Sequence, residues 1–196
     1  HACALPISGG HTWSSVALPE RDFSCVTWAS ELGIFCALAS YGAASGSVIT
    51  SPDGTTWTDR TGLATEGWAD ICWANSLGLF VAICESSPAA MTSPDGATWT
   101  LQTTPTPATY FTRIAWSPAL ELLCACGYSG TNPAYRILTS PDGVNWTARQ
   151  SDSNQYGDIL WAADLGVFVV SVTPSGTFDG GVRDRKSTRL NSSHGK

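Results

Sequence analysis

Histidine is almost absent from this 196-residue sequence, which contains only His1, His11 and His194. A Ser–His or Cys–His catalytic pair needs an imidazole beside the nucleophile, and a histidine-rich metal site needs several imidazoles close together. Both kinds of site are therefore excluded. The sequence also has no glycine-rich loop followed by a helix, the pattern that cradles phosphate groups. No cofactor and no metal ion is predicted.

Charged residues are scarce too, at 13% of the sequence, and there is no lysine between residues 9 and 183. That segment has fifteen Asp or Glu residues and six Arg, which gives a formal charge near −9. An acidic surface repels phosphate, so nucleic acid and membranes are not expected as partners. Apolar runs such as Leu79 to Cys84 are far too short to span a bilayer. Because hydrophobic residues make up 43% of the sequence, a globular fold is expected.

Both ends of the chain differ in character from the segment between them. "KSTRLNSSH", from Lys186 to His194, resembles the in-frame translation of a sequencing-library adapter, and "CALPIS", from Cys3 to Ser8, resembles the opposite adapter. Residues 1–8 and 184–196 are therefore expected to be artefacts that make few tertiary contacts, the second of them disordered. The remaining segment, residues 9–183, is expected to be a fragment of a longer protein.

Tryptophan, by contrast, is abundant and regularly spaced. Eight of the nine tryptophans fall into two series. The first series is Trp28, Trp73, Trp116 and Trp161, with separations of 45, 43 and 45 residues. The second series is Trp13, Trp57, Trp99 and Trp146, with separations of 44, 42 and 47 residues. This spacing indicates an internal repeat of about 45 residues.

Each repeat predicts four short strands. Segments such as "FSCVTWA" and "IFCALAS" flank a Leu-Gly turn, and a third strand, ending in "VITS", is joined to the fourth by a Pro-Asp-Gly turn. Four antiparallel strands at this period are typical of the blades of a β-propeller, and the alternative is a stacked β-solenoid. An all-β partial propeller is predicted, with complete blades at about residues 21–60, 67–102 and 110–149. A single strand near Trp13 precedes them, and a two-strand remnant follows at 155–173.

The turn motif also carries a family resemblance. "SPDGTTW", from Ser51 to Trp57, resembles the Asp-box, or BNR, repeat of sialidase-like propellers, with one residue fewer between Asp and Gly. The whole repeat, over residues 9–178, is similar to tandem propeller repeats of phage and environmental bacterial sequences. The resemblance implies a hairpin between the third and fourth strands, on the face opposite the usual ligand site.

The residues of this motif are predicted to be structural. An Asp in a turn accepts hydrogen bonds from nearby backbone N–H groups, and one carboxylate per turn is too few for a calcium site. The motif residues are Ser51, Asp53, Gly54, Trp57, Ser93, Asp95, Gly96, Trp99, Ser140, Asp142, Gly143 and Trp146.

Two other repeat positions are candidates for ligand binding. Five residues before each tryptophan of the first series stands an aromatic residue: Phe23, Trp68, Phe111 and Tyr156. Three residues before it stand Cys25, Asp70, Arg113 and Asp158. The aromatic residues either pack between blades or form a platform for a sugar. The charged residues either form an ion network between blades or belong to a site. The variable connections between second and third strands add Tyr41, Tyr128, Tyr135 and Arg136 as candidates.

The sequence thus predicts a non-enzymatic binding or structural module, with a glycan or another protein as partner, on a virion, a cell surface or outside the cell. The alternative is a fragment of a sialidase-like glycoside hydrolase. That chemistry uses carboxylates, a tyrosine and an arginine triad, and the arginine motif expected before the first turn motif is missing from the sequence.

Overall fold

The computed structural model describes residues 2–4, 15–18, 21–39, 48–60, 67–85, 87, 89–105, 109–129, 136–151, 155–173 and 187–189. Within these ranges the regular structure is β-strand, apart from a turn of 3-10 helix at Ala163–Leu165. No helix in the described part of the chain is long and apolar enough to cross a membrane.

Three four-stranded antiparallel sheets follow one another along the chain, and in each the strands pair in chain order. The first blade contains β3 (Phe23–Ala29), β4 (Ile34–Ala39), β5 (Val48–Ser51) and β6 (Thr58–Arg60). The second contains β7 (Trp68–Ala74), β8 (Leu79–Cys84), β9 (Ala89–Ser93) and β10 (Thr100–Thr103). The third contains β11 (Thr109–Ser117), β12 (Leu122–Ser129), β13 (Ile137–Ser140) and β14 (Thr147–Arg149). These bounds confirm the three blades predicted from the repeat.

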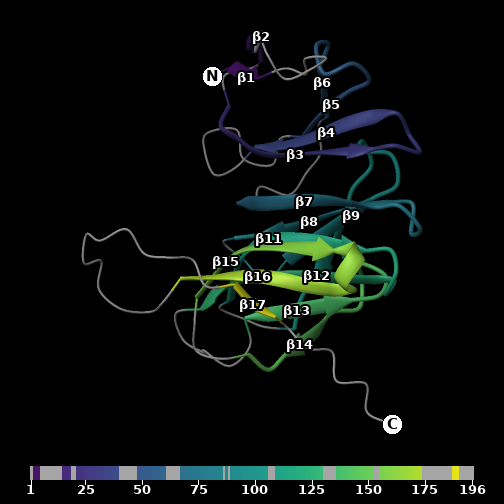
Figure 1. Ribbon diagram of the computed structural model, residues 1–196. Helices are drawn as coiled ribbons and strands as arrows, with labels where there is room; N and C mark the ends of the chain where they lie inside the picture. The colour runs from purple at the N-terminus through teal and green to yellow at the C-terminus, as the bar shows by residue number, and fades with distance from the viewer. Residues whose placement is uncertain are drawn as a thin grey trace.

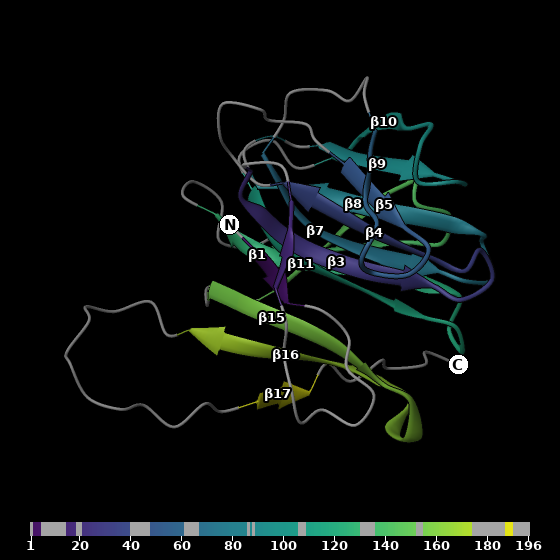
Figure 2. The ribbon, with the colours of Figure 1, turned by 90° about the horizontal axis from the view of Figure 1, so that it is seen from above.

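A fourth, partial blade completes the series. It contains β15 (Gln155–Ala162), β16 (Val167–Thr173) and β17 (Ser187–Arg189). The first strand of each blade lies beside the first strand of the next, so β3, β7, β11 and β15 form the inner side of the assembly (Figure 1). Seen from above, β15, β16 and β17 lie to one side of β3, β7 and β11, toward the bottom of the view (Figure 2). The chain is therefore an all-β partial propeller, and its antiparallel pairing excludes the stacked parallel solenoid.

Hydrophobic cores fill the three junctions between successive blades. The first joins Leu38 and Val48 to Trp68 and Met91. The second and third junctions have equivalent cores. Alternate side chains of a strand point to opposite faces of its sheet, so each blade packs against the blade before it and the blade after it. The cysteines at positions 36, 84, 124 and 126 are buried in these cores, and no disulfide joins any two of the six cysteines from Cys25 to Cys126. Their packing is that of small apolar side chains.

The two ends of the chain differ from expectation at the residues that are described. β1 (Ala2–Ala4) pairs with β2 (Ser15–Ala17), and β17 pairs with β16, so the fourth blade has three strands and not two. The backbone groups along a sheet edge can pair with any extended segment, which explains why residues outside the repeat add strands. Trp13 lies outside the described residues.

Candidate functional site

The inner strands share a β-bulge at one repeat position. The register shifts lie between Phe23 and Cys25, Trp68 and Asp70, Phe111 and Arg113, and Tyr156 and Asp158. A bulge inserts one residue that has no direct partner and bends the strand, so the residues before and after it can face different surroundings. Two repeat positions were proposed as ligand sites, and they face different environments. We call them the aromatic column (Phe23, Trp68, Phe111 and Tyr156) and the polar column (Cys25, Asp70, Arg113 and Asp158).

The aromatic column lies in the cores between blades. Trp68, Phe111 and Tyr156 are 1%, 0% and 5% exposed, and Phe23 in the first blade is half-buried. A ligand would reach the three buried rings only if the blades separated. The sequence allowed two roles for these residues, packing between blades or a platform for a sugar. Their burial favours packing.

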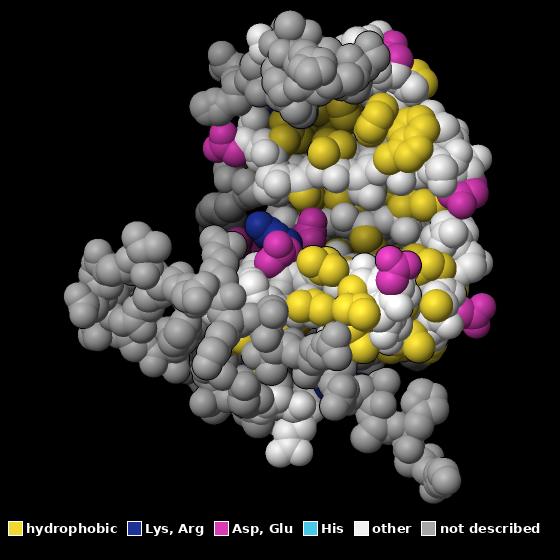
Figure 3. Space-filling model, viewed as in Figure 1, with side chains coloured by type: hydrophobic (Ala, Val, Ile, Leu, Met, Phe, Trp, Pro, Cys, Tyr) yellow, Lys and Arg dark blue, Asp and Glu magenta, His cyan; other side chains and the backbone are white. Residues whose placement is uncertain are grey.

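The polar column forms a network along the inner side of the second, third and fourth blades. Arg113 Nε lies 3.8 Å from Asp158 Oδ1, and both side chains are exposed. Asp70 Oδ2 accepts a hydrogen bond of 3.0 Å from the N–H of Ile114 in the next blade. Figure 3 shows basic atoms flanked by acidic ones on this face. The network joins blades and also presents charge to solvent.

The pKa values of Asp70 and Cys25 are both raised, which favours the neutral form of each side chain. Burial raises the pKa of Asp70, although the N–H groups of Ile114 and Ile71 act in the other direction. Burial, followed by the charge of Asp70, raises the pKa of Cys25 to about 12. At neutral pH Cys25 is therefore a thiol and a poor nucleophile. No three His, Cys, Asp or Glu residues of the described chain form a cluster that could hold a metal ion.

A stacked tyrosine pair stands at the end where the inner strands begin. Tyr110 in β11 faces Tyr128 in β12, with ring centroids 5.2 Å apart and an interplanar angle of 26°. The Tyr128 hydroxyl donates a hydrogen bond of 3.1 Å to Oε1 of Glu85, which is exposed at the end of β8 in the second blade. Burial and this bond raise the pKa of Tyr128, so it remains the donor. We call Glu85, Tyr110 and Tyr128 the tyrosine rim.

Sequence analysis identified only Tyr128 of this rim. Tyr110 directly precedes the aromatic column, but the same position in the other repeats holds Asp22, Gly67 and Gln155, so no repeated pattern marks it. The signal would have been the cross-strand register, which pairs Tyr110 with Tyr128. That register depends on the bulge and was not visible in the sequence.

The other loop candidates fall elsewhere. Arg136 is only 6% exposed, and its carbonyl oxygen accepts a hydrogen bond of 3.1 Å from the N–H of Gly127. Burial limits how far its guanidinium can contact a ligand. Tyr41 and Tyr135 lie outside the described residues.

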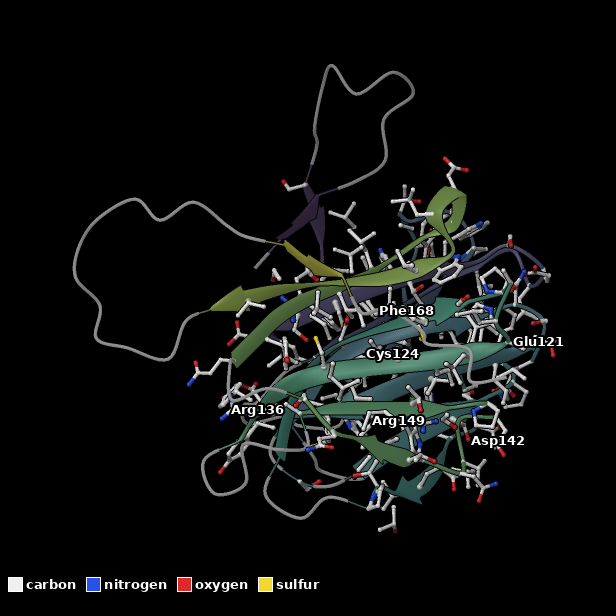
Figure 4. The ribbon with its side chains drawn as sticks, turned by 60° about the horizontal axis from the view of Figure 1, so that its bottom comes forward. Glu121, Cys124, Arg136, Asp142, Arg149 and Phe168 are labelled. Atoms are coloured by element: carbon white, nitrogen blue, oxygen red, sulfur yellow. The ribbon has the colours of Figure 1, made fainter. Side chains whose placement is uncertain are left out.

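The Ser-Pro-Asp-Gly turns lie at the opposite end of the blades. In the third blade, Asp142 and Arg136 lie at opposite ends of the sheet (Figure 4). Within each turn the Ser hydroxyl accepts from the Gly N–H at 2.8 or 2.9 Å, and the Trp indole donates to the Gly carbonyl at 2.9 to 3.1 Å. The polar groups are thus satisfied within the turn. The residues that take these roles are Ser51, Gly54, Trp57, Ser93, Gly96, Trp99, Ser140, Gly143 and Trp146.

The glycine of the turn also contacts the preceding blade. Gly96 and Gly143 have φ of +71° and +76°, values that favour glycine. A Cβ placed on Gly96 would lie 3.0 Å from Thr50 Cγ2, and one on Gly143 would lie 3.1 Å from Thr92 Cγ2. Each of these two turns is therefore packed against a threonine of the blade before it.

The aspartates of the turns are held in their ionised form. Asp53 Oδ1 accepts hydrogen bonds of 2.7 Å from the N–H groups of Thr56 and Thr55, and these bonds lower its pKa. The N–H of Thr98 lowers the pKa of Asp95 in the same way. At Asp142, burial opposes ionisation, but the Asn145 side chain and backbone outweigh it and hold the pKa at about 2.

These shifts predict an acid-sensitive fold. A folded-state pKa below the unfolded value gives stability that is present above the unfolded pKa and is lost as the pH falls through the folded one. We expect the Tm to fall between about pH 4 and pH 2. At pH 7, Asp95→Ala should cost about 1 kcal/mol, because the amides it leaves can bind water. Thermal melts across this pH range should show a smaller acid-induced loss in the variant, and an equal loss would contradict the structural role of the turn.

Several arginines are engaged in the scaffold. Arg60 Nε donates to Thr50 Oγ1 at 2.9 Å, and Arg149 Nε makes the same bond to Thr139 Oγ1 at 2.8 Å in the third blade. Arg21 forms an ion pair of 2.6 Å with Asp59. These three contacts repeat or link strands within blades, and they do not form the arginine triad of a sialidase.

Comparison with known proteins supports the fold. No protein-family model matches the sequence, and no curated protein does. Among solved structures, the chain is similar to one in a nidogen/laminin complex, with a TM-score of 0.63, 13% identity and coverage of 84% of this chain and 61% of that one. It is also similar to streptogramin B lyase, with a TM-score of 0.63, 9% identity and coverage of 91% and 58%. A third similar structure is that of Kuenenia stuttgartiensis hydrazine synthase, with a TM-score of 0.67, 13% identity and coverage of 91% of this chain and 53% of that one.

Identities this low show the fold alone, which is that of a β-propeller. This chain spans between 53% and 61% of the length of the chains it matches. The activities that these names describe belong to those proteins and are not assigned to this chain.

Proposed function

We propose that this propeller is a non-enzymatic binding module whose ligand is a glycan held at the tyrosine rim. The observation that carries the proposal is the stacked pair of Tyr110 and Tyr128, fixed by the hydrogen bond to Glu85. Tyr110 is 40% exposed, so its ring is open to a ligand although it is large and apolar. An ordered, accessible aromatic surface loses little conformational freedom on binding.

The chemistry of the rim suits sugars. Sugar rings present C–H faces that pack against aromatic rings, and their hydroxyls donate to carboxylates such as Glu85. Asp158, which is also exposed, adds negative charge on the inner side of the fourth blade. This charge favours neutral or basic sugars over acidic ones.

Binding is favoured over hydrolysis for two reasons. Among the described residues, Arg21, Arg60 and Arg149 make scaffold contacts, so these three arginines do not form a triad that could hold the carboxylate of a sialic acid. The raised pKa of Cys25 removes it as a nucleophile. The resemblance of the repeats to phage and environmental bacterial propellers supports the proposal that the module belongs to a virion or a cell surface.

A glycan panel with the folded chain tests the proposal. For a sugar that binds, we expect Tyr128→Ala to weaken affinity about tenfold, or about 1.4 kcal/mol, through loss of one ring of the pair. Tyr128→Phe keeps the ring but loses the hydrogen bond to Glu85, so its affinity should lie between those of Tyr128→Ala and the wild type. Affinities can be measured by titration calorimetry on the same glycan.

Val144→Ala is a matched control, because Val144 is 44% exposed in the same blade at the end opposite the rim. It should bind as wild type does, and thermal melts should show that all variants are folded. Unchanged affinity in folded Tyr128→Ala, or no binding to any glycan on the panel, would refute the rim as a glycan site.

A further inference from the structure

Glu85 supplies the carboxylate of the tyrosine rim, and its position is fixed from two sides. Its backbone N–H donates a hydrogen bond of 2.8 Å to the carbonyl oxygen of Gly67, directly before β7, and its Oε1 accepts the bond of 3.1 Å from the Tyr128 hydroxyl. A carboxylate can accept several hydrogen bonds, so the bond from Tyr128 does not use all of its capacity. Because Glu85 is exposed, a ligand can reach the rest.

No salt bridge within the described part of the chain includes Glu85. The ion pairs there join Arg21 with Asp59, and Arg113 with Asp158. Arg136 lies beside the rim in the sheet, since its carbonyl oxygen accepts from the N–H of Gly127, but Arg136 is only 6% exposed. The formal charge near −9 of residues 9–183 adds a general attraction for cations. The rim therefore presents a negative charge to solvent.

The two tyrosine rings add a second attraction for positive charge. The face of an aromatic ring carries partial negative charge and attracts an ammonium group within about 6 Å of the ring centre. Tyr128 stacks on Tyr110 and binds Glu85, so the rings and the carboxylate belong to one patch. Tyr110 is 40% exposed, so part of its ring is open to solvent. A cation at this patch would meet both a carboxylate and an aromatic ring.

We propose that the glycan bound at the tyrosine rim carries free amino sugars, such as glucosamine, whose ammonium group lies beside Glu85 while a sugar ring packs on Tyr110. This inference rests on the proposed function, since it names the class of glycan for the same site. An ammonium group donates up to three hydrogen bonds, which the carboxylate can accept together with the bond from Tyr128. N-acetylation replaces the ammonium by a neutral amide and removes both attractions for a cation.

Two oligosaccharides of equal length test the proposal. Chitosan oligosaccharides consist of glucosamine, and chitin oligosaccharides consist of N-acetylglucosamine, so the pair differs only at the amine of each sugar. Titration calorimetry uses the whole chain in a mildly acidic buffer, in which these amines are protonated. We expect the chitosan oligosaccharide to bind about tenfold more tightly than its chitin counterpart. The difference should shrink as salt is added, because salt screens exposed charges.

Two Glu→Gln variants separate the rim from the overall charge of the protein. Glu85→Gln keeps an acceptor for the Tyr128 hydroxyl but removes the charge, so it should weaken chitosan binding about tenfold and leave chitin binding unchanged. Glu121→Gln is the matched control, because it removes the same charge from an exposed residue in the turn between β11 and β12, at the end of the third blade opposite to Arg136 (Figure 4). It should bind both oligosaccharides as wild type does. Equal weakening by the two variants would overturn the proposal.

The remaining outcomes distinguish this inference from the proposed function. Equal affinity for the two oligosaccharides, with no effect of Glu85→Gln, would refute the amino-sugar class and leave a neutral glycan at the rim. Tighter binding of a lysine-bearing peptide than of the chitosan oligosaccharide would show that the rim serves a protein, and it would overturn the amino-sugar class as well. Absence of binding to these oligosaccharides and to every other glycan of the panel would refute both proposals.

Discussion

Replacing Trp68 by Ala is expected to lower the free energy of unfolding by about 3–5 kcal/mol. The Trp68 side chain is 1% exposed and packs between the first and second blades with Leu38 and Met91. No neighbouring side chain can fill the space of an indole without moving a blade, so most of the cavity should remain. Chemical denaturation with linear extrapolation measures the loss.

Trp28→Ala controls for residue type, because Trp28 is 43% exposed on the face of the first blade. It should cost about 1 kcal/mol, from a smaller loss of buried area. Equal losses in the two variants would contradict a core at the junction. A ligand-binding role for Trp68 without a packing role would instead leave stability unchanged.

Gly127→Ala should have the second largest effect, a loss of about 3 kcal/mol. A Cβ at Gly127 would lie 2.0 Å from the carbonyl oxygen of Tyr110 and 2.8 Å from Phe111 Cα. Both are backbone atoms at the bulge, so the contact can be relieved only by opening the pairing of β11 with β12. The same movement would disturb the stack of Tyr110 on Tyr128, so the near-UV circular dichroism of the tyrosines should change together with the Tm.

Gly78→Ala separates this collision from simple backbone strain. Gly78 has φ of +63°, and a Cβ there would meet nothing within 4 Å. The substitution should therefore cost about 1 kcal/mol, the strain of a left-handed conformation alone. If Gly127→Ala melts as Gly78→Ala does, the close approach of β11 and β12 at Gly127 is not as tight as the structure has it.

Much of the fold could be predicted from the sequence because its signals are local. Tryptophans such as Trp73 and Trp116 recur at strand positions, and each Pro-Asp-Gly turn fixes a hairpin through residues adjacent in the chain. The blade bounds followed from these two patterns. The third strand of the last blade did not, because the pairing of β17 with β16 uses backbone groups that carry no residue pattern.

The candidate site was harder to predict because it depends on register. Tyr110 and Tyr128 come together across two strands whose alignment is set by the bulge beside Phe111. Glu85 then joins them from another blade. The repeated aromatic position pointed instead to residues such as Trp68, whose regular recurrence reflects the repeated blade junction. A repeated pattern finds the scaffold, whereas a binding site lies where one repeat departs from the others.

The contact of the turn glycines with the preceding blade bears on how such a chain can lengthen. Gly96 and Gly143 seat their turns on Thr50 and Thr92, and those threonines recur at one position of the repeat. Each repeat of about 45 residues thus carries a threonine on which the turn of the next blade packs. It also carries a turn glycine that packs on the threonine of the preceding blade. Tandem duplication of that unit copies the joint together with the blade, so a chain can gain blades without evolving a new interface for each.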